Sequence, residues 1–202
     1  MMTELLETLS RIEAGLERLG RKPLLRLMKP GLNLDEIRGQ PVAAGLGRSV
    51  LFEELHSWRD GTLTTGVTLD DIQMFPGFYL LSLEEAIANY RAFTADSRWD
   101  RGWLPLFANG GGDFYVVDFE PRSMGEIRHF RIEESENPVE FRSLSNMMET
   151  LAAAFDRGVF YVDPDRYLEM DDLRFAALAR ELNPDIAWWI DSDPTAHSGD
   201  RA

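Results

Sequence analysis

The feature that most constrains how this chain can fold is a run of three glycines at residues 110–112, set directly before an apolar segment. Glycine reaches positive φ at little steric cost, so the run predicts a sharp change of chain direction. Residues 114–117 follow soon after, are aromatic or β-branched, and favour a buried strand. Trp103 and Pro105 precede the glycines, Pro105 at a place where no ladder N–H is needed. We therefore expect an aromatic anchor and a turn that lead into a central strand, with Trp103 packed beside it.

Amphipathic helices are expected on both sides of this corner, and capping residues mark several of their starts. Thr3, Ser49 and Ser82 each precede an apolar stripe with helical spacing, and Ser82 with Glu85 forms a capping box. The pair Asp163-Pro is a favoured helix start and predicts another helix. The expected helices cover residues 3–20, 24–28 (a short helix or connector), 33–38, 49–58, 82–93, 143–155 and 163–182.

Strands are expected where aromatic and β-branched residues gather between turns that contain glycine or proline. These expected strands cover residues 75–81, 114–117, 126–133 and 159–162, the last as an edge strand. Residues 39–47 hold three glycines and a proline, which predicts a loop. The pair Asp60-Gly61 predicts a turn that ends the preceding helix.

The charge of the chain is acidic and unevenly distributed. The net charge is −14, with +2 in residues 1–31 and −16 in residues 32–202. An acidic surface repels phosphate backbones, so we expect no nucleic-acid binding. The same surface attracts basic proteins, although solubility alone also accounts for a negative charge.

Composition also bears on the compartment. The chain has no cysteine, which excludes disulfides and thiolate metal sites. No apolar run approaches the roughly 18 residues that span a bilayer, and the N-terminus carries acids where a signal peptide needs bases. We expect one cytoplasmic domain that does not insert into membranes, with added terminal segments.

The sequence contains no recognisable catalytic, metal or nucleotide motif. The glycine run is followed by Asp113 and a strand, whereas a phosphate loop leads into a helix N-terminus. The histidines His56, His129 and His197 are isolated, so none forms a pair with metal-ligand spacing. We therefore predict no catalytic residue, no metal and no cofactor. A pair of carboxylates distant in the sequence stays an alternative, because a glycosidase dyad needs no motif.

Four of the five tryptophans divide into two groups. Trp58 and Trp103 are expected in the core, which is the usual place for a large aromatic side chain next to strands. Trp188 and Trp189 lie in a separate aromatic patch, residues 187–190, ahead of a polar tail. This pair either packs against the domain or forms an interface with another copy or a partner.

Four landmarks follow one another in order along residues 33–160. A helix ends in a Trp-Arg-Asp-Gly segment, a strand feeds a helix at residues 78–86, an aromatic corner enters a strand, and a late helix covers residues 143–155. The positions singled out, all in the first and third landmarks, are Trp58, Asp60, Gly61, Trp103, Gly111, Gly112 and Asp113. In this order and spacing the chain resembles the SUKH superfamily, which includes a yeast cell-wall-synthesis regulator and many bacterial toxin-immunity proteins.

The resemblance implies an α+β fold, with helices packed around a twisted, mostly antiparallel sheet. It implies that the chain binds a protein rather than catalysing a reaction. We interpret the seven landmark positions mainly as fold determinants. Together with the Pro30-Gly31 pair and the polar C-terminus, the resemblance divides the chain into an N-terminal helical extension (1–31), a SUKH-like core (32–162), a C-terminal helix with the aromatic patch (163–190) and a tail expected to be disordered (191–202).

Three functions are open on this basis. The leading hypothesis is a non-enzymatic protein-binding module, an immunity protein whose acidic face attracts a basic toxin domain. The second is an enzyme or small-ligand binder with a pocket near Asp113. The third is a homo-oligomeric scaffold built through helix 3–20 and the pair Trp188-Trp189.

Overall fold

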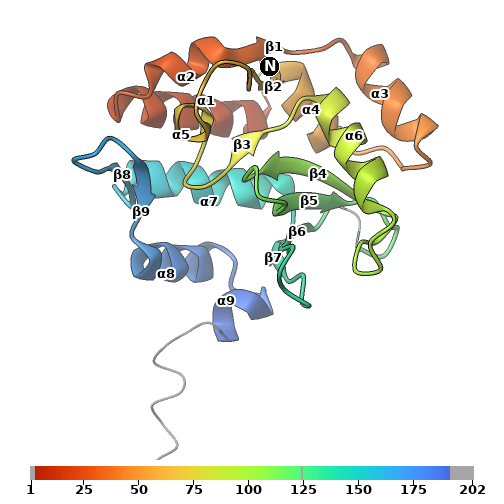
Figure 1. Cartoon of the computed structure of the whole chain (residues 1–202). Helices are drawn as coiled ribbons and strands as arrows, with labels where there is room; N and C mark the ends of the chain where they lie inside the picture. The colour runs from red at the N-terminus through yellow and green to blue at the C-terminus, as the bar shows by residue number, and fades with distance from the viewer. Residues whose placement is uncertain (1–2, 124, 192–202) are drawn as a thin grey trace, which may run out of the picture.

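The computed structural model describes residues 3–123 and 125–191. It has the expected α+β fold, in which helices pack around a five-stranded antiparallel sheet (Figure 1). The strands, in spatial order, are β3 Tyr79–Leu80, β4 Trp103–Ala108, β5 Phe114–Asp118, β6 Ile127–Phe130 and β7 Val139–Phe141. The central strand is therefore β5, as the sequence predicts, and all of its residues are buried.

The glycine run forms the corner between β4 and β5. Gly110 and Gly112 have φ values of +78° and +106°, and the Asn109 amide donates to the Asp113 carbonyl over 3.2 Å. The segment ahead of the corner differs from expectation, because it is a complete strand rather than an anchor and a turn. Its proline is tolerated because the β4–β5 register shifts directly after Pro105, which relaxes the demand for a ladder N–H.

Four long helices begin with capping side chains, three at the predicted caps Thr3, Ser49 and Ser82 and the fourth at Ser143, at the start of the predicted helix 143–155. Thr3, Ser49, Ser82 and Ser143 each accept a hydrogen bond from the amide three residues later. The helices are α1 Glu4–Arg18, α4 Val50–Trp58, α6 Leu83–Phe93 and α7 Leu144–Asp156. The short helices α2 Lys22–Leu27, α5 Leu69–Ile72 and α9 Ala187–Asp191 also form.

Two predictions in the N-terminal half are wrong. Helix α3, Leu34–Ala43, continues through much of the predicted loop 39–47, because Ile37 and Pro41 lie one turn apart and are both buried. This shared burial outweighs the single amide donor that proline lacks. The predicted turn at Asp60-Gly61 is strand β2, Arg59–Thr62, which pairs with β1, Met28–Pro30.

The predicted helix start at Asp163 is also wrong. Strand β8, Phe160–Val162, turns back into β9, Leu168–Met170, to make a two-stranded sheet. The Asp163 carboxylate accepts the Tyr167 amide over 2.8 Å, and this local bond competes with helix formation. The helix, α8 Asp172–Leu182, begins later, with Asp171 as its cap.

The strand expected at residues 75–81 is reduced to β3. Residues 75–78 form a turn instead, which a bridge between Phe75 and Phe78 closes. The disordered tail expected at residues 191–202 lies outside the described residues, apart from the last residue of α9. The division of the chain into four segments stays a prediction.

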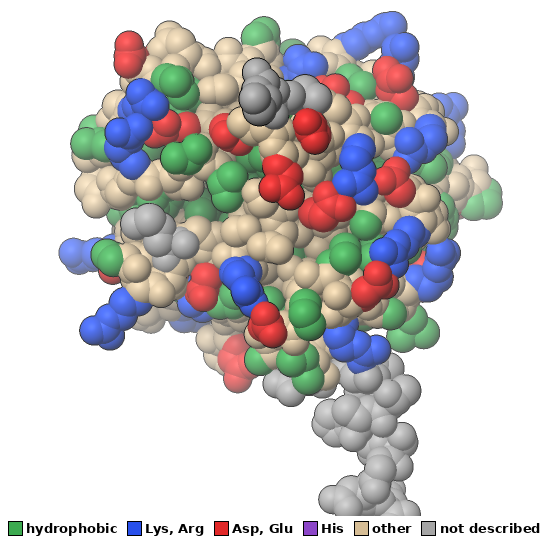
Figure 2. All heavy atoms as spheres, turned by 180° about the vertical axis from the view of Figure 1, so that it is seen from behind, with side chains coloured by type: hydrophobic (Ala, Val, Ile, Leu, Met, Phe, Trp, Pro, Cys, Tyr) green, Lys and Arg blue, Asp and Glu red, His purple; other side chains and the backbone are tan. Residues whose placement is uncertain are grey.

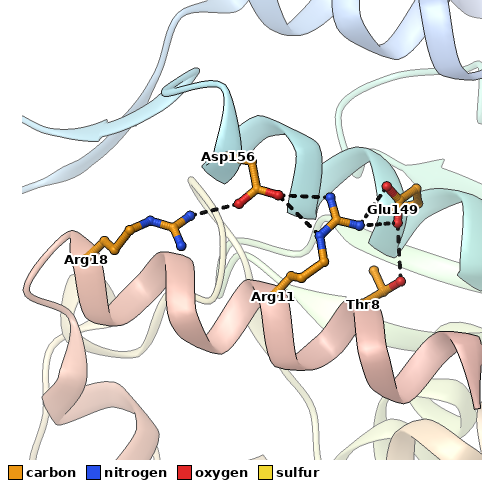
Figure 3. A network of polar contacts seen from close by, with 5 residues as sticks. All are labelled: Thr8, Arg11, Arg18, Glu149 and Asp156. Carbon is orange, nitrogen blue, oxygen red and sulfur yellow. Dashed lines mark hydrogen bonds and ion pairs between the residues drawn. The ribbon is translucent and has the colours of Figure 1, made fainter. Parts of the chain in front are cut away.

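Helix α1 docks along α7 of its own chain (Figure 1). Gly15 lets the two helices approach closely, because a Cβ there would lie 2.6 Å from the Phe155 side chain. At the rim, Arg11 bridges Glu149 at 2.7 Å and Asp156 at 2.9 Å (Figure 3). The apolar stripe of α1, residues Leu5, Leu9, Ile12 and Leu16, is buried in the common core.

Candidate functional site

The first landmark residues lie where α4 runs into β2 and meets the start of α6. The Asp60 carboxylate accepts the Leu83 amide at 2.8 Å and lies 3.2 Å from His56 Nδ1. Burial raises the pKa of Asp60, but the hydrogen bonds from His56 and Leu83 outweigh burial and hold this pKa below its usual value. Asp60 therefore links three elements from a largely buried position.

Gly61 and Trp58 belong to the same junction. Gly61 has a φ of +78°, and a Cβ there would lie 2.2 Å from the Ser82 amide nitrogen. Only glycine fits this close approach of β2 to the cap of α6. Trp58 is half-buried at the end of α4, with the Arg59 guanidinium 5.8 Å from its ring.

Trp103 lies at the first position of β4 and is buried. Its indole N–H donates to Asp118 Oδ2 over 3.2 Å. The Arg128 guanidinium lies 5.6 Å from the Trp103 ring and 3.3 Å from the same carboxylate. Trp103 thus ties the beginning of β4 to the end of β5 and to β6.

The Asp113 side chain holds the glycine corner through hydrogen bonds. One carboxylate oxygen accepts the Ile132 amide at 2.9 Å, and the other accepts the Asn109 side-chain amide at 2.7 Å. Gly112 is close to Ile132, because a Cβ there would lie 2.8 Å from Ile132 Cδ1. Gly111 donates its amide to Asn109 Oδ1 at 2.7 Å. These contacts hold the corner, and both oxygens of Asp113 are engaged.

The landmark residues therefore occupy three separate places in the fold. None of them lines either of two open cavities that lie elsewhere on the molecule. The first cavity, about 520 Å³, lies between the end of α3 and the end of α6. Its ionisable side chains are Tyr90, Arg101 and Glu120, and the Tyr90 hydroxyl donates to the Arg101 carbonyl. The pair of carboxylates that a glycosidase-type enzyme requires is absent from this lining.

The second cavity, about 610 Å³, is a groove between β7 with its preceding loop and the start of α9. We call it the acidic groove, because its lining holds three carboxylates and no base. Glu126 and Asp185 form ion pairs with Arg128 and Arg142, whose side chains lie outside the lining. The lining residues are Glu126, Glu136, Pro138, Val139, Asp185, Ile186, Ala187 and Trp188.

A buried polar cluster stands behind the groove. The Glu140 carboxylate accepts the Tyr115 hydroxyl at 2.9 Å and lies 3.0 Å from His129 Nδ1. The indole N–H of Trp189 donates to the Glu140 carbonyl, which ties α9 to β7. Burial, followed by the charge of Glu140, raises the pKa of Tyr115 well above its usual value. This cluster holds the two walls of the groove against each other.

The two tryptophans of the aromatic patch thus have different surroundings. Trp189 is buried against Phe141 and Phe175, with ring centroids 5.8 and 5.9 Å away. Trp188 is half-buried and lines the groove, with the Arg131 guanidinium 5.1 Å from its ring. Sequence reasoning marked both residues but missed Glu140, whose only signal is a carboxylate between two apolar strand residues.

The remaining surface carries mixed charge on the face in Figure 2, where acidic side chains are interspersed with Lys and Arg. Among the described residues, no group of three or more His, Asp or Glu side chains is placed to hold a metal ion. Within the same part of the chain, no helix is both long enough and apolar enough to cross a bilayer.

Comparison with known proteins gives a family match. The model of the SMI1 / KNR4 family (SUKH-1) matches residues 52–153. This region begins in α4, ends in α7 and contains the five-stranded sheet and all seven landmark residues. Trp188 and Trp189 lie beyond it. No curated protein matches the chain.

Proposed function

The chain belongs to the SMI1 / KNR4 family (SUKH-1), and on that premise we propose that it is a non-enzymatic protein-binding module. The family includes immunity proteins, and we infer that this chain is one of them and neutralises a basic toxin domain. The observation that carries the proposal is the acidic groove, which is open, partly apolar and lined by carboxylates alone among charged groups.

Charge supports a basic partner. The chain has a net charge of −14, and a field of this sign accelerates encounter with a cationic protein and disfavours acidic ones. Carboxylates at the rim of an interface also fix the orientation of a partner that carries arginine or lysine. A cytoplasmic location suits such a role, because an immunity protein must meet its toxin inside the cell that it protects.

The carboxylates with perturbed pKa values favour binding over catalysis. A general acid needs a raised pKa. The hydrogen bonds from Arg38 and Arg48 instead hold the pKa of Glu53 below its usual value, against the effect of burial. Asp113, near which a pocket would have to lie, has both oxygens engaged by amide groups.

One of the two surfaces through which a homo-oligomer was expected to form is not available for contact with another copy. The homo-oligomeric alternative requires the apolar stripe of α1 to meet another copy, but this stripe is buried against the remainder of the same chain. We therefore propose a monomer before partner binding, and light scattering of the purified protein checks its mass.

Affinity capture from the native cell tests the proposed function. The tagged chain is expected to retain a basic protein that elutes as salt is raised, because surface charge pairs are screened by ions. An unrelated protein of similar net charge is the control bait and should not retain it. Repeated recovery of a metabolite alone, or of no basic protein, would overturn the proposal.

A further inference from the structure

The walls of the acidic groove come from two distant parts of the sequence. One wall is β7 with its preceding loop, inside the region that matches the family, and the other is residues 185–188, outside it. We propose that the acidic groove is the contact site for the partner, and that its occupant is an extended protein segment carrying arginine or lysine beside apolar side chains. This inference rests on the proposed function and names the site and the partner chemistry.

The apolar part of the lining indicates that the occupant carries apolar side chains as well as a cation. Pro138, Val139 and Ile186 form it together with Trp188. Aliphatic and aromatic surface of this kind gains from the removal of water, and tryptophan is a frequent anchor in protein interfaces. The Arg131 guanidinium near the ring restrains Trp188, so little side-chain freedom remains to be lost on binding.

The charged residues of the lining favour an occupant of positive charge. The ion pair between Arg142 and Asp185 has side chains 61% and 70% exposed. An exposed pair of this kind contributes little to stability, so the guanidinium of a partner can replace Arg142 at low cost. Glu136 is exposed on the loop ahead of β7, together with Glu133 and Glu134. An acidic segment would meet like charge at Glu136 and along the loop ahead of β7.

The groove is also pre-formed. Trp189 and Glu140 tie α9 to β7, and Tyr115 fixes the Glu140 carboxylate from the central strand. A partner therefore does not have to order the site, which lowers the entropic cost of association. Because one wall lies beyond the family match, the choice of partner is expected to depend on the C-terminal segment of this chain.

The test uses a short fluorescein-labelled peptide of alternating arginine and leucine, followed by fluorescence anisotropy. The groove variant is Glu136→Gln with Asp185→Asn. The matched control is Asp165→Asn with Glu169→Gln, which removes the same charge from exposed positions on and near the β8–β9 turn. We expect the groove variant to bind about tenfold more weakly than the wild type and the control variant to be unchanged within about twofold, given the usual strength of charge pairs.

Equal binding by the groove and control variants would overturn the inference, as would equal binding of a peptide with glutamate in place of arginine. Circular dichroism before the titration establishes that both variants are folded. The proposed function fails separately. If a captured basic protein binds the groove variant as well as it binds the wild type, the site alone is refuted. Peptide binding at the groove without any captured basic protein refutes the toxin-neutralising role alone.

Discussion

Gly61 is the residue at which backbone geometry most strictly decides the amino acid. Gly61 and Gly66 share a φ of +78°, but a Cβ would meet the Ser82 backbone only at Gly61, while Gly66 has open space. Gly66→Ala is expected to cost about 1 kcal/mol for the left-handed backbone alone. Gly61→Ala is expected to cost about 3 kcal/mol or more, because the chain must also shift. Urea unfolding measures both, and equal losses would contradict this account of the junction.

Substitution of Asp113 tests whether the glycine corner has a structural or a reactive role. Asp113→Ala leaves the Ile132 amide and the Asn109 side chain without their acceptor, at an expected cost of about 2 kcal/mol in the free energy of unfolding. Peptide binding at the acidic groove is expected to be unchanged, since Asp113 does not line it. A variant of undiminished stability that has lost binding would contradict both statements. Chemical denaturation and anisotropy give the two readouts.

At the scale of elements, α9 depends on one of its two tryptophans. Trp189→Phe removes the indole N–H that donates to the Glu140 carbonyl and shrinks a buried ring, at an expected cost of about 1–2 kcal/mol. Trp188→Phe keeps an aromatic ring in a half-buried position, so its expected cost is under about 0.5 kcal/mol. Unfolding followed by circular dichroism compares the two. A larger loss for Trp188→Phe would show that the roles are reversed.

The packing of α1 on α7 rests on its apolar stripe rather than on the ion pairs in Figure 3. Arg11 is 42% exposed, and its partners Glu149 and Asp156 are similarly exposed. Arg11→Gln is therefore expected to cost under about 1 kcal/mol, and less at high salt. Ile12 is fully buried, so Ile12→Ala is expected to cost about 2–4 kcal/mol. Thermal unfolding ranks the variants, and the reverse order would contradict this view.

The elements that sequence reasoning located correctly begin with a local signal. The Ser82–Glu85 capping box fixes the start of α6 within a few residues, and the glycine run fixes the entry to β5. The wrong predictions fall where a contact between residues distant in the sequence determines the secondary structure. Pro41 stays helical because the core buries it, and β2 becomes a strand because β1, about 30 residues earlier in the chain, pairs with it. No local pattern carries that information.

At the scale of the whole molecule, the sequence predicts only part of the acidic groove. Trp188 stands out in the sequence as an aromatic residue in a separate patch. The carboxylates that join it, Glu126, Glu136 and Asp185, are spread over about 60 residues and look like ordinary surface acids. Their convergence follows from the position of α9 beside β7, which the Trp189 hydrogen bond to Glu140 fixes. Such a tertiary contact has no periodicity to detect.

The dependence of stability on pH is the property of the whole molecule that the ionised side chains determine. The pKa values of Glu53, Asp60 and Asp156 lie below their usual values. The Arg98 guanidinium lowers the pKa of Asp96 to about 2. A carboxyl group whose pKa is lower in the folded chain stabilises the fold above its unfolded pKa, and this stabilisation is lost as the pH falls through the folded pKa.

These groups therefore predict a free energy of unfolding that is level between about pH 7 and 5 and falls from about pH 4 towards pH 2. Urea unfolding at a series of pH values measures it. Glu53→Gln removes the negative charge and one of the two oxygens that accept from Arg38 and Arg48, so this variant is expected to be less stable at pH 7 and to lose less on acidification. If relief of the repulsion among the many acids dominated instead, stability would rise below pH 4. A wild-type curve that rises there, or a Glu53→Gln curve parallel to the wild type, would refute the assignment of these carboxylates as the groups that stabilise the fold.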